Sequence, residues 1–240
     1  MKRWSKIIQP DTLTIIGGEP LIHPRIYDVL LHARKCFPKS RIELATNGLL
    51  FSKKPKLKET IEKIGNVSIN LSLHNSNPEV KDKIYQLLKH YILDKKWRKL
   101  DRYNWKKGSL RAEIIPETEM WQEYRKVING KLKPYNDNNP KASYSACGVN
   151  IFPIVYNGRM YKCPPISMLR THLEKFDRLE DPDWQTYLKY KGISYRDSKT
   201  DIDRFMKNIH QPHSVCGMCP ANPSHFEQQD AVIKHSIEKL

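Results

Sequence analysis

The sequence predicts an α/β protein, with a parallel β-sheet domain over residues 1–130 and a small cysteine-rich module over residues 131–240. Two observations predict the first part: short apolar, β-branched runs alternate with segments of helical periodicity, and polar residues gather where the predicted strands end. A third observation predicts the second part, since four of the five cysteines lie beyond residue 146.

The composition limits the class of protein. A chain of 240 residues can bury one sizeable core and a smaller appendage. No apolar run approaches the roughly 20 residues that span a bilayer, and the basic N-terminus has no apolar signal-peptide region, so we expect a cytoplasmic protein without a membrane segment. The net charge of +16 is compatible with nucleic acid or an acidic partner, but dispersed surface charge is the favoured interpretation.

Four strand–helix units are predicted along the first half. The strands are residues 12–16, 41–45, 67–73 and 110–115, and the helices are residues 24–37, 56–64, 78–91 and 117–128. Such alternation predicts a parallel sheet with right-handed crossovers. Residues 94–108 are interpreted as a polar, basic insertion and residues 131–145 as a linker. Beyond them, Asn157-Gly158 predicts a hairpin turn between residues 150–156 and 159–163.

Small polar residues follow three successive predicted strands. They are Gly17, Gly18 and Glu19 after the first strand, Asn47 after the second and Ser72 at the end of the third. Parallel sheets bind ligands at the carboxyl ends of their strands, so these residues are candidates for one shared pocket. Taken alone, Gly-Gly-Glu-Pro also fits a tight strand-to-helix turn with an acidic residue at the helix start.

The order of these motifs, GGEP, then TNG, then S-L-H, resembles the radical SAM superfamily over about residues 10–130. The resemblance implies a partial (βα) TIM-like barrel that binds S-adenosyl-L-methionine (SAM). It implies that Gly17, Gly18 and Glu19 meet the methionine part of SAM, and that Asn47 and Ser72 lie along the rest of the molecule. No side chain is assigned a catalytic role.

The sequence departs from that family in the cysteines that bind the SAM-cleaving cluster. In the family these form C-x3-C-x2-C ahead of GGEP, whereas the sixteen residues before Gly17 contain no cysteine. Cys36 is no substitute, because it falls on the apolar side of a predicted helix, where we expect it to be buried. We therefore expect a partner polypeptide to supply the missing loop, or a degenerate protein that has kept the fold for binding.

The four remaining cysteines have the spacing of a metal site. Cys147 and Cys163 form C-x10-G-x4-C around the predicted hairpin turn, and Cys216 and Cys219 form C-x2-C. Four thiolates are the usual ligands of a 4Fe–4S cluster and of structural zinc, and the spacing allows both.

The pattern of these cysteines resembles the SPASM and twitch extensions that follow radical SAM domains. It is closer to the single-cluster twitch type, because His225 stands where SPASM has its next cysteine. This resemblance favours iron–sulfur over zinc. Neither His213 nor His225 is predicted to be a ligand.

Two hypotheses follow. In the first, the chain is a radical SAM-like iron–sulfur protein with one auxiliary 4Fe–4S cluster, which takes part in radical modification of a peptide, nucleotide or small substrate once the missing loop is supplied. In the second, it is a non-catalytic iron–sulfur or zinc protein whose basic surface binds nucleic acid or an acidic partner.

Overall fold

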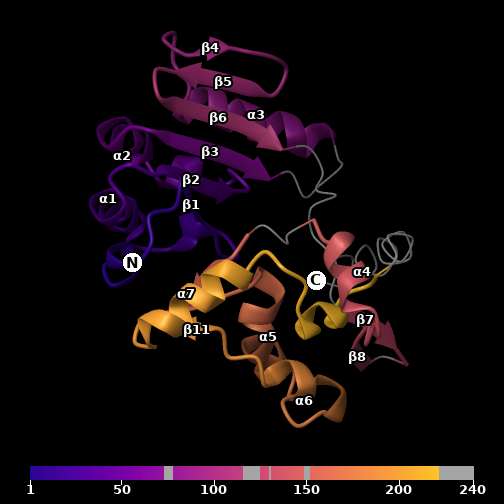
Figure 1. Ribbon diagram of the computed structural model, residues 1–240. Coiled ribbons are helices and arrows are strands. Elements are labelled where there is room, and N and C mark those ends of the chain that lie inside the picture. Colours follow the sequence, from indigo (N-terminus) through magenta and orange to yellow (C-terminus); the bar gives the residue numbers. More distant parts are fainter. Residues whose placement is uncertain (73–77, 116–124, 130, 149–151, 222–240) are drawn as a thin grey trace. The chain divides into compact units, whose positions relative to one another are not determined.

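The computed structural model describes residues 1–72, 78–115, 125–129, 131–148 and 152–221. Two compact units make up the chain: unit 1 is Met1–Thr118 and unit 2 is Glu119–Leu240 (Figure 1). The sequence analysis placed this division at residue 130. In the described part of the chain, no helix is long and apolar enough to cross a membrane.

Unit 1 is built on a six-stranded sheet with the order β1-β2-β3-β6-β5-β4. The strands are β1 (Thr12–Ile15), β2 (Arg41–Thr46), β3 (Val67–Ser72), β4 (Arg98–Lys99), β5 (Asn104–Lys107) and β6 (Leu110–Ile115). The pairs β1–β2, β2–β3 and β3–β6 are parallel, which confirms the predicted parallel sheet. The last two strands, β5 and β4, extend it in antiparallel fashion.

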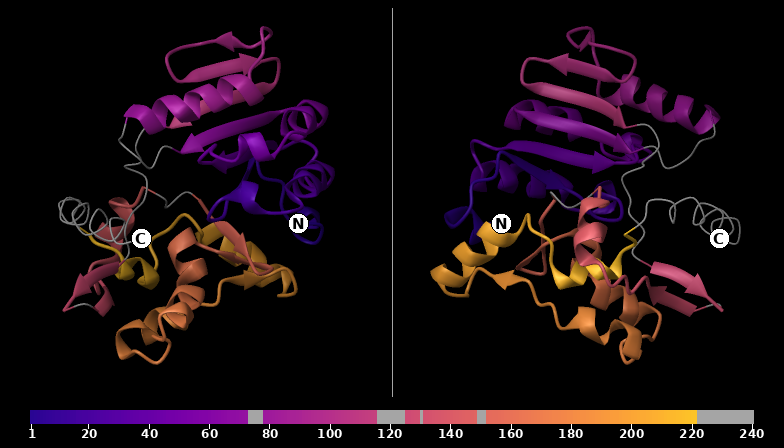
Figure 2. Two further views of the ribbon diagram at one scale, coloured as in Figure 1. Left: turned by 180° about the vertical axis from the view of Figure 1, so that it is seen from behind. Right: turned by 45° about the vertical axis from the view of Figure 1, so that its right-hand side comes forward.

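Three helices lie on one face of this sheet (Figures 1 and 2). They are α1 (Ile26–Cys36), α2 (Leu57–Ile64) and α3 (Pro78–Tyr91), and short 3₁₀ turns are η1 (Trp4–Lys6), η2 (Pro20–Ile22) and η3 (Phe51–Lys53). In α1, Ile26, Leu30 and Ala33 recur with the helical period and are fully buried against the strands. Helix burial therefore agrees with the periodicity from which the helices were predicted.

Arg34 of α1 fastens the helix ends at the amino-terminal edge of the sheet. Its guanidinium donates hydrogen bonds to six backbone carbonyls, those of Phe37, Pro38, Ser40, Ile64, Gly65 and Asn66. The carbonyls at the end of a helix have no partner within the helix, so one planar cation with several donors satisfies groups at the ends of both α1 and α2.

Two features of unit 1 were not predicted. Residues 94–108, predicted as a polar, basic insertion, contain β4 and β5, and Trp105 of β5 is only 5% exposed. Strand β5 was not recognised in the sequence because Trp105 is its one large apolar residue and lysines surround it. Cys36 is partly exposed rather than buried, and its sulfur lies 3.3 Å from His32 Nε2.

Unit 2 contains two small sheets and several short helices. The strands are β7 (Arg125–Ile128), β8 (Lys131–Pro134), β9 (Ile154–Tyr156), β10 (Arg159–Tyr161) and β11 (Ile193–Ser194). The helices are α4 (Pro140–Ser145), α5 (Pro164–Lys175), α6 (Pro182–Leu188), α7 (Lys199–Asn208) and the 3₁₀ turn η4 (Ser214–Met218). A second core, which includes Trp184, Met218 and Cys219, packs α5, α6 and η4 together.

The predicted helix over residues 117–128 was wrong in its last turn. Residues 125–128 form β7, which pairs antiparallel with β8 through a turn that includes Asn129 at φ 50°. The rest of that prediction, residues 117–124, lies outside the described residues. The predicted linker over residues 131–145 was also wrong, because β8 and α4 lie within it. Both segments are too short to show several periods of a hydrophobic pattern.

The predicted hairpin is confirmed. Strands β9 and β10 pair antiparallel, and Asn157 and Gly158 join them with φ angles of 48° and 79°. Two successive positive φ angles are the requirement of a type I′ turn, which Asn-Gly meets at low cost. Cys163 follows two residues after β10 and is the N-cap of α5.

Candidate functional site

The loop after β1 offers an open backbone. Gly17 and Gly18 are both exposed, neither has a positive φ, and a Cβ added to either would meet no atom within 4 Å. The fold itself therefore does not require glycine at these positions. The absence of side chains instead leaves the backbone amides and carbonyls accessible at the carboxyl end of β1, where a ligand could approach closely.

Both carboxylate oxygens of Glu19 accept hydrogen bonds from residues at this edge of the sheet. Its Oε1 accepts hydrogen bonds from the Thr46 hydroxyl at 2.6 Å and from the Leu21 amide at 2.9 Å, and its Oε2 accepts one from the Asn47 amide at 2.8 Å. The carboxylate thus caps η2 and joins the loop after β1 to the end of β2. Its direct role in this structure is to fix the geometry of two neighbouring strand ends.

Asn47 and Ser72 lie at the same edge of the sheet. Asn47 follows β2 directly, and its side-chain oxygen accepts a hydrogen bond from the Leu49 amide at 3.0 Å. Ser72 is the last residue of β3, which pairs in parallel with β2. The structure therefore brings the ends of β1, β2 and β3 together as predicted. His74 and Asn75, which follow β3 in the sequence, lie outside the described residues.

Thr46 is a functional residue that the sequence analysis did not single out. It is 2% exposed, its hydroxyl donates to Glu19, and the same oxygen accepts from the Gly48 amide at 3.1 Å. Gly48 has a φ of 75°, and a Cβ there would lie 2.6 Å from Leu71. Both residues belong to the T-N-G motif, so the motif fixes the strand end as well as presenting Asn47.

The four predicted metal-binding cysteines all lie in unit 2. Cys147 follows α4, Cys163 precedes α5, and Cys216 and Cys219 belong to the turn η4 and its C-cap. The first three lie within electrostatic range of one another or of a shared lysine, Lys162. All four are free thiols. Over the described part of the chain, however, no three His, Cys, Asp or Glu side chains are arranged so that they could hold a metal ion.

Two of these thiols are desolvated. Burial raises the pKa of Cys163 to about 12, and burial also raises the pKa of Cys216. A metal centre binds thiolate, so it would have to displace these protons on binding. Four cysteine sulfurs are the donor set of a 4Fe–4S cluster. The donor set is therefore chemically suited to the cluster.

The turn that carries Cys216 and Cys219 is docked on an earlier segment of unit 2. The Asp137 amide donates to the Gly217 carbonyl at 2.7 Å, and the Ser143 hydroxyl donates to the Cys219 carbonyl at 3.0 Å. A Cβ on Gly217 would lie 2.6 Å from the Asp137 carbonyl oxygen. The glycine inside C-x2-C is thus needed for this close backbone contact.

Lys162 is a second residue that sequence reasoning missed. It is 3% exposed and directly precedes Cys163. Its Nζ donates to the carbonyls of Ile209 and Gln211, at 2.5 and 2.6 Å, and lies 4.6 Å from the centre of the Tyr144 ring. Burial lowers the pKa of Lys162, while the nearby Cys216, Cys163 and Cys147 oppose that effect. No sequence signal marks a lysine as buried.

His213 acts as a cap. Its Nδ1 accepts from the Val215 amide at 3.3 Å, and its carbonyl accepts from the Cys216 amide at 2.9 Å. Burial lowers the pKa of His213, with a smaller contribution from Lys162. His213 therefore caps η4 through both its side chain and its carbonyl. His225 lies outside the described residues.

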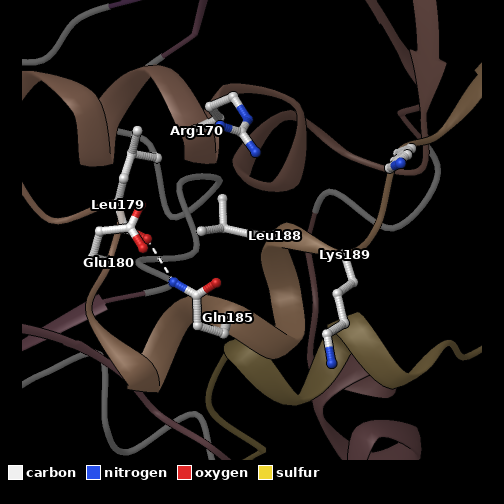
Figure 3. A pocket seen from close by; sticks show the side chains of 7 residues that line it. Arg170, Leu179, Glu180, Gln185, Leu188 and Lys189 are labelled. Carbon is white, nitrogen blue, oxygen red and sulfur yellow. Dashed lines mark hydrogen bonds between the residues drawn. The ribbon is translucent and has the colours of Figure 1, made fainter.

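A surface pocket in unit 2 lies away from all the predicted residues. Figure 3 shows its lining, which α5, α6 and the segments beside them provide: Arg170, Leu179, Glu180, Gln185, Leu188, Lys189 and Lys191. Gln185 Nε2 donates to the Leu179 carbonyl at 2.6 Å across one side of it. Three of its seven lining residues are exposed cations, and none of the predicted site residues lines it.

Comparison with known proteins gives a family match within unit 1 and a similar curated protein. The family model described as "Radical SAM superfamily" matches residues 2–103. A GTP 3′,8-cyclase from Microcystis aeruginosa is 34% identical over 70 residues, which are 29% of this chain and 20% of that relative. The match therefore spans about a fifth of the relative's length.

Proposed function

We propose that the chain is an iron–sulfur protein that binds SAM in unit 1 and acts in radical modification of a substrate, because residues 2–103 match the radical SAM superfamily. One observation supports the SAM site above all: three neighbouring parallel strands end together, and Gly17 and Gly18 are open there without any demand from the fold. Membership of the superfamily suggests SAM-dependent radical chemistry and implies a 4Fe–4S cluster.

Each residue at the strand ends has a proposed part in binding. Gly17 and Gly18 offer backbone hydrogen bonds to the amino-acid part of SAM. The side chains of Asn47 and Ser72 are placed along the same edge to contact the rest. Glu19 orients this edge through Thr46 and the Asn47 amide rather than by direct contact. The chemistry that SAM supplies, with an electron from a reduced cluster, is a 5′-deoxyadenosyl radical that abstracts hydrogen from the substrate.

None of the sixteen residues before Gly17 is a cysteine, so this chain does not contain the C-x3-C-x2-C motif of the SAM-cleaving cluster in the position that the family uses. We propose that a polypeptide carrying C-x3-C-x2-C completes the site in trans. The strands of unit 1 would then form part of a (βα) barrel. Peptides, nucleotides and small metabolites all remain within the proposed substrate range. The five free thiols favour a reducing compartment, so a cytoplasmic location is part of the proposal.

Calorimetric titration with SAM tests the first site. Gly17→Ala and Gly18→Ala add a methyl group where the protein has open space, so both variants are expected to melt like the wild type. A methyl group would obstruct close approach of SAM to the backbone, and affinity should fall at least tenfold. Wild-type protein that binds no SAM, with or without a C-x3-C-x2-C partner, would refute the SAM site.

In unit 2 we propose a SPASM/twitch-like module with one auxiliary 4Fe–4S cluster on Cys147, Cys163, Cys216 and Cys219. Three of the four sulfurs already lie in electrostatic range of Lys162, and Cys216 and Cys219 share one turn. The cluster would accept an electron or anchor the substrate. Its four thiolate ligands come from the segment after α4, the β9–β10 hairpin and η4.

Anaerobic purification tests the auxiliary cluster. The proposal expects a brown protein that absorbs near 400 nm and contains about four iron atoms per chain. Cys163→Ser and Cys216→Ser should each lose most of this iron. The matched control is Cys36→Ser on α1, which should keep it, because Cys36 lies in unit 1 beside His32. Colourless protein with one zinc per chain would overturn the iron–sulfur assignment.

The non-catalytic alternative has one observation in its favour. Arg98, Lys106 and Arg111 occupy directly paired positions on β4, β5 and β6, and all three are exposed. None of them has an ion-pair partner among the described residues. Like charges directly opposite each other destabilise strand pairs, so a phosphate backbone on this row would relieve the repulsion.

Binding of single-stranded RNA at several salt concentrations tests this alternative. The triple substitution of Arg98, Lys106 and Arg111 by Gln should abolish a steep salt dependence, since each lost phosphate contact lowers the slope by about 0.7 for single strands. RNA binding that is weak, or equal in the triple variant, would remove the alternative.

A further inference from the structure

Lys162 is a buried cation at the centre of the four-cysteine region. Its ammonium has three N–H donors and no acceptor. Two of these donors are directed at the carbonyls of Ile209 and Gln211, and the charged group also faces the ring of Tyr144. Among the described residues no carboxylate forms an ion pair with it. A lysine that is 3% exposed without a carboxylate partner is unusual, because burying an unpaired charge is unfavourable.

The contacts of Lys162 join the three segments that carry the cysteines. Lys162 itself follows the hairpin strand β10 and directly precedes Cys163. Ile209 and Gln211 lie in the chain that leads from α7 to Cys216. Tyr144 lies in α4, its carbonyl accepts from the Cys147 amide at 3.2 Å, and its hydroxyl donates to the His210 carbonyl at 2.6 Å. One side chain therefore fixes the positions of three segments relative to one another.

The charged groups near Lys162 also connect it with the cysteine site. The groups that act on it electrostatically are the sulfurs of Cys216, Cys163 and Cys147, and it acts in turn on His213. Four thiolates give a 4Fe–4S cluster a net negative charge, and each reduction adds one more electron. A fixed positive charge nearby stabilises such a cluster, and it stabilises the reduced form more than the oxidised form.

We propose that Lys162 is the positioning residue and the fixed counter-charge of the four-cysteine site, which holds its three segments together and raises the reduction potential of the cluster. This inference rests on the proposed function, since it needs a cluster on the four cysteines. It goes beyond that function because it assigns a role in the site to a residue that is not a ligand.

The variants Lys162→Gln and Lys162→Met separate the two roles. Glutamine keeps N–H donors for the carbonyls of Ile209 and Gln211 but removes the charge, and methionine removes both. Lys175→Met is the matched control, because Lys175 is an exposed lysine at the far end of α5 and its loss changes the net charge equally. Each full-length protein is reconstituted anaerobically with iron and sulfide.

Three quantities are measured: iron per chain, the midpoint potential in a redox titration followed by electron paramagnetic resonance, and the melting temperature without iron. We expect Lys162→Gln to load iron and to show a midpoint shifted to more negative potential. Lys162→Met should load less iron than Lys162→Gln, and Lys175→Met should match the wild type in both respects.

A midpoint in Lys162→Gln equal to that of the wild type, at equal iron content, overturns the counter-charge. Equal iron in Lys162→Met and Lys162→Gln overturns the positioning role. Both results leave the proposed cluster intact. A wild-type chain that binds no iron refutes the cluster itself, and the role of Lys162 with it, so the two failures are distinguishable.

Discussion

Removal of the Glu19 carboxylate is expected to destabilise unit 1 in the absence of any ligand. Glu19→Ala deletes the acceptor of three hydrogen bonds, from Leu21, Thr46 and Asn47. The Thr46 hydroxyl is 2% exposed, so water cannot readily replace its lost partner. Leu21 is also fully buried, so only the amide of the partly exposed Asn47 is placed to reach water.

The magnitude follows from these differences in burial. A buried donor left without its partner costs about 1–3 kcal/mol, and a typical hydrogen bond whose donor can reach water contributes about 0.5–1.5 kcal/mol. With two buried donors and one that reaches water, the sum for Glu19→Ala is about 2.5–7.5 kcal/mol of unfolding free energy. Glu19→Gln keeps a carbonyl oxygen for Thr46 and Leu21 but presents an NH₂ group to the Asn47 amide, so about 1–2 kcal/mol should be lost.

Urea denaturation of the full chain, followed by circular dichroism, measures these changes. Glu113→Ala is the control, because Glu113 is an exposed carboxylate on β6 of the same sheet and should change stability by less than about 0.5 kcal/mol. If Glu19→Ala is as stable as Glu113→Ala while SAM affinity falls, Glu19 is a direct ligand and its assignment as a positioning residue is wrong.

Three further predictions concern unit 1. Arg34→Lys replaces a planar, multi-donor group by a single ammonium, leaves several carbonyls at helix ends unsatisfied, and should lower the urea-derived stability by about 2–4 kcal/mol. Gly48→Ala places a Cβ 2.6 Å from Leu71 at a φ of 75°, so it should lower stability by about 1–3 kcal/mol, and an unchanged melting temperature would contradict this. The hydrogen bond from Lys58 holds the pKa of Asp94 below its usual range against the effect of burial. Its contribution is therefore present above about pH 4 and is lost as the pH falls further, and Asp94→Asn should flatten the stability profile in that acid range alone.

The sequence predicted elements well where hydrophobic periodicity ran through several turns or a full strand. The strand ends of the candidate site could be predicted because β1, β2 and β3 are apolar and bounded by Gly or Asn. Strand β5 was missed because Trp105 is one buried residue among lysines, and β7 because four residues carry only two periods of alternation.

The candidate metal site shows a second limit. The cysteines and the Asn157-Gly158 turn could be identified from spacing, since the turn depends on two adjacent residues. Lys162 could not, because its partner Ile209 lies 47 residues away in the sequence. Its burial is a property of three segments that meet only in the folded chain. Likewise, the role of Glu19 depends on Thr46, which is 27 residues away.

The close contact between Gly217 and Asp137 has a consequence for how the protein is made. The turn with Cys216 and Cys219 is hydrogen-bonded to a segment about 80 residues earlier, for example from the Ala221 amide to Asp137, across 84 residues. Such a contact closes a long loop and cannot form until the end of unit 2 has left the ribosome. Cys216 and Cys219 are therefore synthesised after the segment around Asp137 on which they dock. Completion of the four-cysteine set is thus a late step in biosynthesis.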